Sequence, residues 1–145
     1  MRVEVHIDES VPEIKVDITA PAMNREVSDL IRRMESGKSV LSGIRNKRYY
    51  PLNLTQVYAV TTQGDRILAH TLEGEYEVKG RMYELEEKLA PEGFVRISQS
   101  TLANVSHIQN FAMHFNGTME LRFKNGAVEY VSRRYVPSIK KYFRL

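Results

Sequence analysis

The segment that decides the fold is residues 94–108, FVRISQSTLANVSHI. It gathers five polar residues with no glycine or proline among them: Arg96, Ser98, Gln99, Ser100 and Thr101. Apolar residues stand on both sides, so both flanks are expected to lie in a β core. The polar middle has three interpretations: a solvated edge strand, a catalytic serine cluster, or an exposed tip that touches a ligand.

Around this segment the chain alternates short strand patterns with turn signals. Gly-containing pairs occur in QGD, EGE, PEG, NGT and KNGA, and they favour the positive φ of hairpin turns. Two helical patterns interrupt the series, one in RMYELEEKL and one at the C-terminus. The spacing predicts a mainly β domain over residues 38–145, connected by hairpins rather than βαβ crossovers. The predicted strands are 40–44, 48–52, 57–62, 66–72, 75–79, 94–97, 108–115, 118–123 and 127–131.

The first 37 residues have a pattern of their own. Residues 3–7 and 14–18 alternate apolar and polar side chains with period two, which predicts a strand pair. A helical pattern follows and is expected to end in SGKS, residues 36–39; its apolar residues are Val27, Leu30, Ile31 and Met34. We therefore predict a β-β-α appendage over residues 1–37 that serves dimerisation or regulation, or completes the core.

Composition favours a globular protein of a reducing compartment. Of 145 residues, 42% are hydrophobic, 27% are charged and none is cysteine, so there is no disulfide framework or thiolate metal site. The N-terminus has no apolar h-region, and no apolar run approaches the roughly 18 residues of a membrane span. We expect a soluble, cytoplasmic protein.

Positive charge is concentrated in the last third of the chain. Residues 94–145 hold eight Lys/Arg against two Asp/Glu, whereas residues 1–37 hold five against eight. Such a local excess is typical of a protein that binds a polyanion. A solvated basic surface is the alternative interpretation.

The residue patterns give little support to enzyme chemistry. The four histidines stand at no recognised metal-ligand spacing, which favours structural or surface roles for His6, His70, His107 and His114. There is no Gly-x-Ser-x-Gly elbow, and no base is apparent for Ser98, Ser100, Ser106 or Ser132. A glycine-rich phosphate loop is also absent. We predict no catalysis, no cofactor, no metal and no small-molecule substrate.

The C-terminal segment YVSRRYVPSIKKYF, residues 130–143, concentrates cations at a predicted strand-to-helix junction. Pro137 has a fixed φ and no amide hydrogen, so the last helix is expected to begin near residues 135–137. An arginine in this junction can bond guanine or a phosphate, and lysines on the helix add point charges.

Three ordered motifs make this chain resemble the LytTR DNA-binding family. Members typically have a Phe-x-Arg-x-His-x-Ser-x-x-x-Asn segment, an Asn-Gly turn and a Val-Ser-Arg stretch near the C-terminus. The matching residues are Phe94, Arg96, Ser100 and Asn104, then Asn125 and Gly126, then Val131, Ser132 and Arg133. Ser98 stands where the family usually has histidine. The resemblance covers about residues 40–145 and implies a mostly β domain whose loops enter successive major grooves and bend the duplex, commonly at paired direct repeats.

The resemblance also implies a set of DNA contacts. Base contacts carry over to Gln99 and Arg134, since glutamine can pair with adenine and arginine with guanine. A third contact falls in TTQGDRI, where a carboxylate at Asp65 would repel phosphate, so Gln63 and Arg66 are predicted instead. The predicted phosphate contacts are Arg96, Ser98, Ser100, Ser132, Arg133, Lys140 and Lys141.

The expected partners follow from the same resemblance. The appendage is too short for a receiver domain, so the chain is similar to stand-alone bacterial LytTR transcription regulators, some of which are restrained by a membrane-protein partner. Double-stranded DNA and a second copy of the chain are the partners expected. Two alternatives stay open: a protein-interaction module that docks an acidic partner, and a single-strand or RNA binder that stacks bases on Tyr49, Tyr50 and Phe111.

Overall fold

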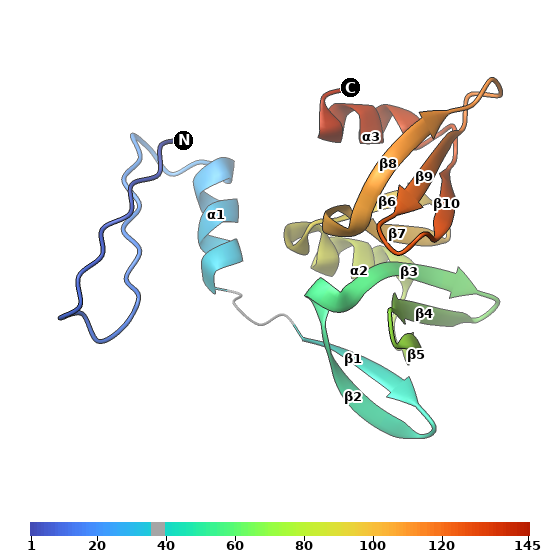
Figure 1. Ribbon diagram of the computed structural model, residues 1–145, viewed down its shortest axis with the longest axis horizontal. Coiled ribbons are helices and arrows are strands. Elements are labelled where there is room, and N and C mark those ends of the chain that lie inside the picture. Colours follow the sequence, from blue (N-terminus) through green and yellow to red (C-terminus); the bar gives the residue numbers. More distant parts are fainter. Residues whose placement is uncertain (36–39) are drawn as a thin grey trace.

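A long antiparallel sheet, a small sheet and three α-helices make up the described part of the chain, residues 1–35 and 40–145 of a computed structural model (Figure 1). The helices are α1 (Arg25–Glu35), α2 (Met82–Leu89) and α3 (Val136–Phe143), with short 3-10 helices η1 (Leu54–Gln56), η2 (Ala90–Glu92) and η3 (Val105–His107). The strands are β1 (Val40–Arg45), β2 (Arg48–Asn53), β3 (Val57–Gln63), β4 (Arg66–Thr71), β5 (Gly74–Val78), β6 (Phe94–Ser98), β7 (Thr101–Asn104), β8 (Ile108–Met113), β9 (Met119–Phe123) and β10 (Val128–Val131).

The strands form two sheets, of order β2-β1-β5-β4-β3-β7-β6 and β10-β9-β8, and all pairs are antiparallel. The predicted mainly β fold is confirmed, and each strand predicted after residue 40 is present within a few residues. One strand was missed: β7, whose sequence TLAN is short and carries small residues. All four of its residues are buried, because both faces of the sheet are covered at β7: Leu102 packs in the cluster with α2 and Ala103 in the cluster with the small sheet.

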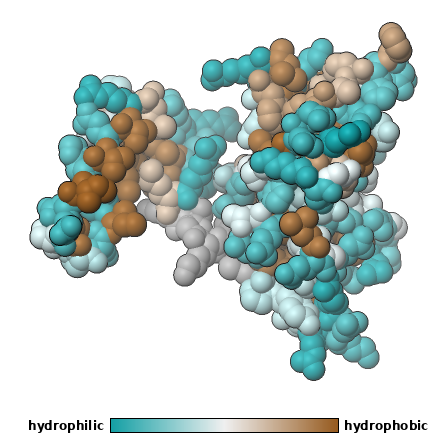
Figure 2. All heavy atoms as spheres, viewed as in Figure 1, coloured by the Kyte–Doolittle hydropathy of each residue, from teal (hydrophilic) through white to brown (hydrophobic). Residues whose placement is uncertain are grey.

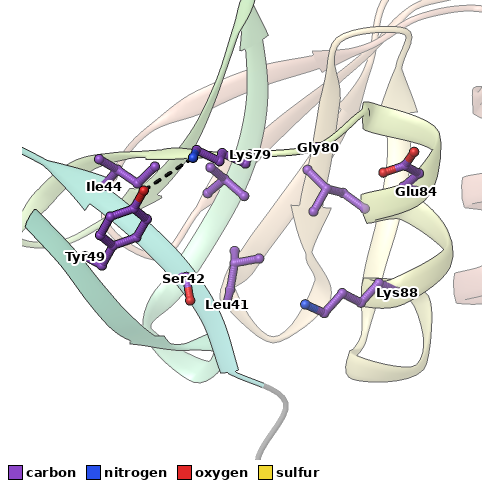
Figure 3. Close-up of a pocket in the computed structure, with 10 residues that line it drawn as sticks. Leu41, Ser42, Ile44, Tyr49, Lys79, Gly80, Glu84 and Lys88 are labelled. Carbon is purple, nitrogen blue, oxygen red and sulfur yellow. Dashed lines mark hydrogen bonds between the residues drawn. The ribbon is translucent and has the colours of Figure 1, made fainter. Parts of the chain in front are cut away.

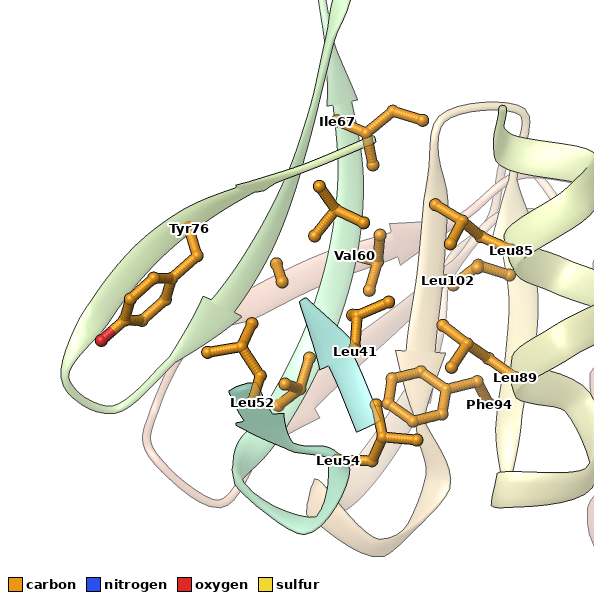
Figure 4. Close-up of a cluster of buried hydrophobic side chains, with 13 residues drawn as sticks. Leu41, Leu52, Leu54, Val60, Ile67, Tyr76, Leu85, Leu89, Phe94 and Leu102 are labelled. Atoms are coloured by element: carbon orange, nitrogen blue, oxygen red, sulfur yellow. The ribbon is translucent and has the colours of Figure 1, made fainter. Parts of the chain in front are cut away.

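The two faces of the long sheet are covered by different layers. On one face, Leu85 and Leu89 of α2 pack with Val60 and Leu102 in a buried cluster (Figure 4). On the other, Ala59 and Ala103 pack with the small sheet and with Ile139 of α3. Neighbouring residues of β3 and β7 thus face opposite layers, as a period of two requires.

The same alternation decides where Arg96 points. Phe94 belongs to the cluster on the α2 face, whereas Val95 and Ile97 belong to the cluster under the small sheet. Arg96 therefore shares the α2 face with Phe94. Its guanidinium is close to α2, where Nη1 donates to Glu86 Oε2 at 2.6 Å.

The N-terminal prediction is partly wrong. The helix is present as α1, and α1 lies against η2. Residues 3–7 and 14–18 are extended, but no strand is assigned within residues 1–24. The physical reason is that an isolated two-stranded pair is marginal in water, and nothing in the described chain covers its apolar face. The predicted helix end at residues 36–39, and with it the domain boundary, lies outside the described residues.

None of the helices in the two described ranges has the length and apolar character needed to cross a membrane.

Candidate nucleic-acid interface

Two backbone hydrogen bonds bring three connecting segments to one end of the long sheet. The Thr62 amide donates to the Ser100 carbonyl at 2.7 Å, which joins the β3–β4 hairpin to the β6–β7 turn. The Ser132 amide donates to the Ile97 carbonyl at 3.0 Å, which joins the β10–α3 junction to the end of β6. We call residues 62–66, 98–101 and 132–135 the three-turn end. All three segments that the sequence singled out therefore lie side by side.

The β6–β7 turn presents Gln99 at its tip. Gln99 and Ser100 are exposed, and Ser98 is half-buried. The Ser98 and Ser100 hydroxyls are 3.3 Å apart, and Ser98 Oγ also accepts from the Ser100 amide at 3.3 Å. The serines thus shape the turn, while the Gln99 side chain extends into solvent.

The β3–β4 turn lies next to it and projects at the right of Figure 1. Strands β3 and β7 pair Thr61 with Thr101, and the bond from the Thr62 amide to the Ser100 carbonyl keeps the two hairpin ends together beyond that pair. Gly64 has a φ of +64°, which favours glycine in this tight reversal. Gln63 and Arg66 are both exposed, and Arg66 Nε lies 3.4 Å from Glu77 Oε2 in a solvent-exposed ion pair.

The β10–α3 junction adds two exposed arginines to this end. Its turn is closed by the Ser132 carbonyl, which accepts from the amides of Tyr135 at 2.9 Å and Val136 at 3.2 Å. Arg133 and Arg134 are exposed, and the Arg134 guanidinium lies 5.8 Å from the centre of the Tyr135 ring. No ion pair engages either arginine among the residues that the structure describes.

Helix α3 extends the basic surface from the junction. It begins at Val136 with Pro137 in its first turn, as the proline predicted. Val136 and Ile139 are buried, whereas Lys140 and Lys141 are exposed. The buried residues fix the helix against the core, so the lysines face solvent.

Arg96 is not available in the way the sequence suggested. Its side chain is 16% exposed; Nε donates to the Ser98 carbonyl at 2.7 Å and Nη2 to the Gln99 carbonyl. With Glu86 on Nη1, all three guanidinium nitrogens hold the β6–β7 turn against α2. Sequence reasoning missed Glu86, although the strand alternation that puts Arg96 on the α2 face was a signal for it.

The histidines have structural partners. His107 Nε2 lies 2.6 Å from the Thr55 carbonyl, and His70 Nε2 lies 2.7 Å from Thr61 Oγ1. His114 approaches Glu120 at 3.3 Å, and His6 lies 3.9 Å from Glu4. No group of three or more His, Cys, Asp or Glu suited to a metal ion occurs within residues 1–35 and 40–145. These contacts agree with the structural and surface roles expected for the histidines.

The aromatic residues proposed for base stacking are not brought together. Tyr49 and Tyr50 lie on β2 at the edge of the long sheet, and the Tyr50 ring packs 5.5 Å from Tyr76. Phe111 lies on β8 in the other sheet and packs 4.8 Å from Phe143. The stacking alternative therefore has no continuous platform in this fold.

A shallow hollow of about 290 Å³ lies between β1 and α2 (Figure 3). Tyr49 and Lys79 border it, and Lys79 Nζ donates to the Tyr49 hydroxyl at 3.3 Å. The hollow shares no residue with the three-turn end and holds no pair of acid and base groups at hydrogen-bond distance. The three-turn end is the stronger candidate site.

The fold and the three-turn end together define a β domain whose turns expose glutamine and arginine side chains at one end of the long sheet. The three α-helices of the described chain are far apart in sequence and form no helix-turn-helix. The family model of the LytTr DNA-binding domain matches residues 47–144. The chain belongs to this family, which is a family of DNA-binding domains and not a class of enzymes.

Relatives and solved structures agree with this assignment. Proteins of Staphylococcus aureus strains NCTC 8325 and COL, described as uncharacterized HTH-type transcriptional regulators, are each 32% identical over 143 residues, covering 97% of both chains. A LytTr DNA-binding domain from Bacillus cereus has the same fold, with a TM-score of 0.71 at 24% identity; the match covers 75% of this chain and all of that one.

Proposed function

We propose that this chain is a bacterial transcription regulator that recognises specific sequences in double-stranded DNA with its three-turn end. The observation that carries the proposal is the pair of hydrogen bonds from Thr62 to Ser100 and from Ser132 to Ile97. They gather exposed side chains able to form paired hydrogen bonds with base edges, on the most basic part of the chain. The proposal includes neither catalysis nor a cofactor.

The roles of the side chains follow from their chemistry and exposure. Gln99 and Gln63 are assigned to adenine, and Arg134 and Arg66 to guanine, because each can form a bidentate pair there. Arg66 can exchange its exposed partner Glu77 for a base, at a cost of about 1 kcal/mol or less.

Phosphate contact is assigned to the exposed cations Arg133, Lys140 and Lys141, to the exposed Ser100, and to the half-buried Ser98 and Ser132. Such contacts set register and salt dependence rather than sequence. Arg96 is assigned to positioning, because binding a phosphate would cost it three internal hydrogen bonds. Asp65 is exposed in the β3–β4 turn, and its carboxylate favours approach of a base edge over a phosphate at that point.

Because its three turns lie at one end of the long sheet, the three-turn end could contact successive grooves from one side of a bent duplex. We propose that two copies occupy paired direct repeats and that binding takes place in the cytoplasm. The names of the Staphylococcus aureus relatives support a role in transcription.

Selection of bound duplexes from a random library tests the proposal directly. Enrichment of a repeated motif is expected, followed by tight binding of that motif in fluorescence anisotropy at several salt concentrations. Weak binding without sequence preference that disappears near physiological salt would instead favour a surface that docks an acidic protein partner.

A further inference from the structure

Residues 1–24 expose two rows of β-branched side chains. The first row is Val3, Val5 and Ile7, and the second is Ile14, Val16 and Ile18. Their exposure runs from 38% at Ile18 to 95% at Ile14. Figure 2 shows hydrophobic residues gathered over this part of the molecule, at the left. Burying one such side chain is worth about 1.5–3 kcal/mol, so a contiguous exposed row of this kind marks an interaction surface.

The two rows lie on two extended segments, which we call the first and second legs, on either side of a turn at residues 8–11. The backbone of both legs is unpaired in the described structure. The Val11 amide donates to the Asp8 carbonyl at 3.2 Å, and the Asp8 carboxylate accepts from the Ser10 amide at 2.9 Å. Outside this turn no strand ladder is assigned in residues 1–24. The ion pairs described here stay within one leg, Arg2 with Glu4 and Lys15 with Asp17. Extended backbone without a partner is a template for strand addition.

The first leg is complementary to itself. When residues 2–8 run antiparallel to a second copy about a two-fold axis at Val5, Arg2 comes opposite the partner's Asp8 and Glu4 opposite the partner's His6. Val3 then faces the partner's Ile7, and Val5 faces its own copy. Every apolar residue meets an apolar residue, and every charged or imidazole group meets one of the opposite kind. This symmetry is what an isologous two-fold interface requires.

We propose that residues 2–8 of two copies pair as antiparallel strands about Val5, and that the N-terminal segment is the dimer interface of this protein. The second leg extends the same sheet: the turn at Asp8–Val11 sets a register that brings Lys15 opposite Glu4 and Asp17 opposite Arg2. Two copies then contribute four strands with a common apolar face. A hairpin from one chain is marginal, whereas three or more strands with an apolar face are stable, and this difference favours a second copy over a hairpin closed within one chain.

This dimer interface does not depend on the proposed DNA binding, because it joins two chains in the absence of DNA. It lies in a part of the chain separate from the three-turn end. The two-fold axis is proposed for the paired N-terminal strands alone and not for the β domains on DNA. A dimer formed in this way would raise the effective concentration of the second β domain at a paired site.

Light scattering coupled to size-exclusion chromatography tests the proposal on the full chain without DNA. The expected mass is twice 16.8 kDa for the native sequence and 16.8 kDa for Val5→Lys, which places two ammonium groups on the axis. Leu72→Lys is the matched control, because Leu72 is 71% exposed and Val5 77%, and it should stay dimeric. A thermal melt followed by circular dichroism checks that the β domain of each variant is folded.

A cysteine crosslink tests the axis itself. The native chain has no cysteine, so Val5→Cys introduces one thiol per chain, opposite its own copy. Opposed Cβ atoms in an antiparallel pair are about 4.5–5.5 Å apart, close enough for a disulfide after a small adjustment. Mild oxidation should give a covalent dimer from Val5→Cys and none from Leu72→Cys. A monomeric native chain, or crosslinking of Val16→Cys in place of Val5→Cys, would overturn the proposal. Since neither measurement includes DNA, its outcome is separate from that of the proposed function.

Discussion

The amide of Thr62 donates to the carbonyl of Ser100 at 2.7 Å, one residue beyond the last Cα pair of the β3–β7 ladder. This bond joins the ends of the β3–β4 and β6–β7 hairpins, which carry the exposed side chains of Gln63 and Gln99. In the proposed function both glutamines are assigned to adenine edges.

Replacing Gln99 with alanine should reduce discrimination between DNA sequences. Loss of a bidentate pair to adenine is expected to cost about 1–3 kcal/mol on the selected site and little on unrelated duplexes. The measurement is anisotropy with both kinds of duplex at fixed salt. Gln56→Ala is the matched control, since Gln56 is exposed in η1 at the other end of β3. Equal losses on both duplexes would show that Gln99 reads no base.

Arg134→Ala should behave like Gln99→Ala, with a loss of about 1–3 kcal/mol confined to the selected sequence, because its role is assigned to a guanine. The ratio of affinities for the selected duplex and a duplex changed at one G·C pair measures it. An unchanged affinity for the selected site after Arg134→Ala would contradict the assignment.

Lys140→Ala and Lys141→Ala should weaken binding to all duplexes alike. The plot of log K against log salt has a negative slope, and each removed phosphate contact reduces the magnitude of that slope by about 1. Lys124→Ala provides the control: its amide bonds the His107 carbonyl, beside η1 and away from the three-turn end. An unaltered salt slope in both α3 variants would remove these lysines from the contact surface.

The sequence predicted the strands from Val40 onward because their alternation and glycine turns reflect local burial and local φ. The same rule missed β7, and it predicted two strands within residues 3–18 where the structure has none. β7 is buried on both faces and therefore does not alternate, whereas residues 3–7 alternate well but pair with no strand in the described residues. Which strand a segment pairs with depends on the tertiary fold, and an alternation of period two does not identify that partner.

In the candidate site, too, the sequence located the local features but not the tertiary contacts that bring them together. The family resemblance located the three turns, but their proximity depends on the backbone amides of Thr62 and Ser132, and the sequence does not show which carbonyls these amides bond. Arg96 was expected to contact a phosphate because it matches the arginine of the family motif and is a cation. Its place on the α2 face follows from the alternation of side chains along β6. Its partner Glu86 is ten residues away in sequence.

Removing the Glu86 carboxylate separates the two roles considered for Arg96. If Arg96 braces the β6–β7 turn, Glu86→Gln should lower sequence discrimination, and Arg96→Ala should leave the salt slope unchanged. If Arg96 bound phosphate, Glu86→Gln would release the guanidinium and strengthen binding to every duplex. Salt titrations of both variants distinguish these outcomes, with Glu87→Gln, an exposed neighbour on α2, as the control.

Asn104→Ala should destabilise the β domain strongly. Asn104 is 3% exposed; its Nδ2 donates to the carbonyls of Leu54 at 3.2 Å and Val57 at 2.8 Å, and its Oδ1 accepts from the Ser106 amide at 3.1 Å. Truncation leaves these buried groups without partners, at a cost of about 2–4 kcal/mol. Urea unfolding measures the loss, and Asn110→Ala, on the exposed surface of β8, should change stability by less than about 0.5 kcal/mol.

His70 should make the protein less stable in mild acid. Its side chain is 11% exposed, and burial lowers the pKa of His70 below its ordinary value of 6.5, although the carboxylate of Glu75 acts in the opposite direction. The folded state therefore favours neutral imidazole, whose Nε2 lies 2.7 Å from Thr61 Oγ1. Below pH 6.5 the unfolded chain binds a proton that the folded chain does not, so the free energy of unfolding falls as the pH drops toward the folded pKa.

Urea unfolding at about pH 7.5 and about pH 5.5 measures this dependence. The native chain should lose stability between the two values, with a slope of at most about 1.4 kcal/mol per pH unit from this one group. His70→Gln keeps a hydrogen-bonding side chain but cannot titrate, so its loss should be smaller. An equal acid loss in His70→Gln and the native chain would assign the effect to another group.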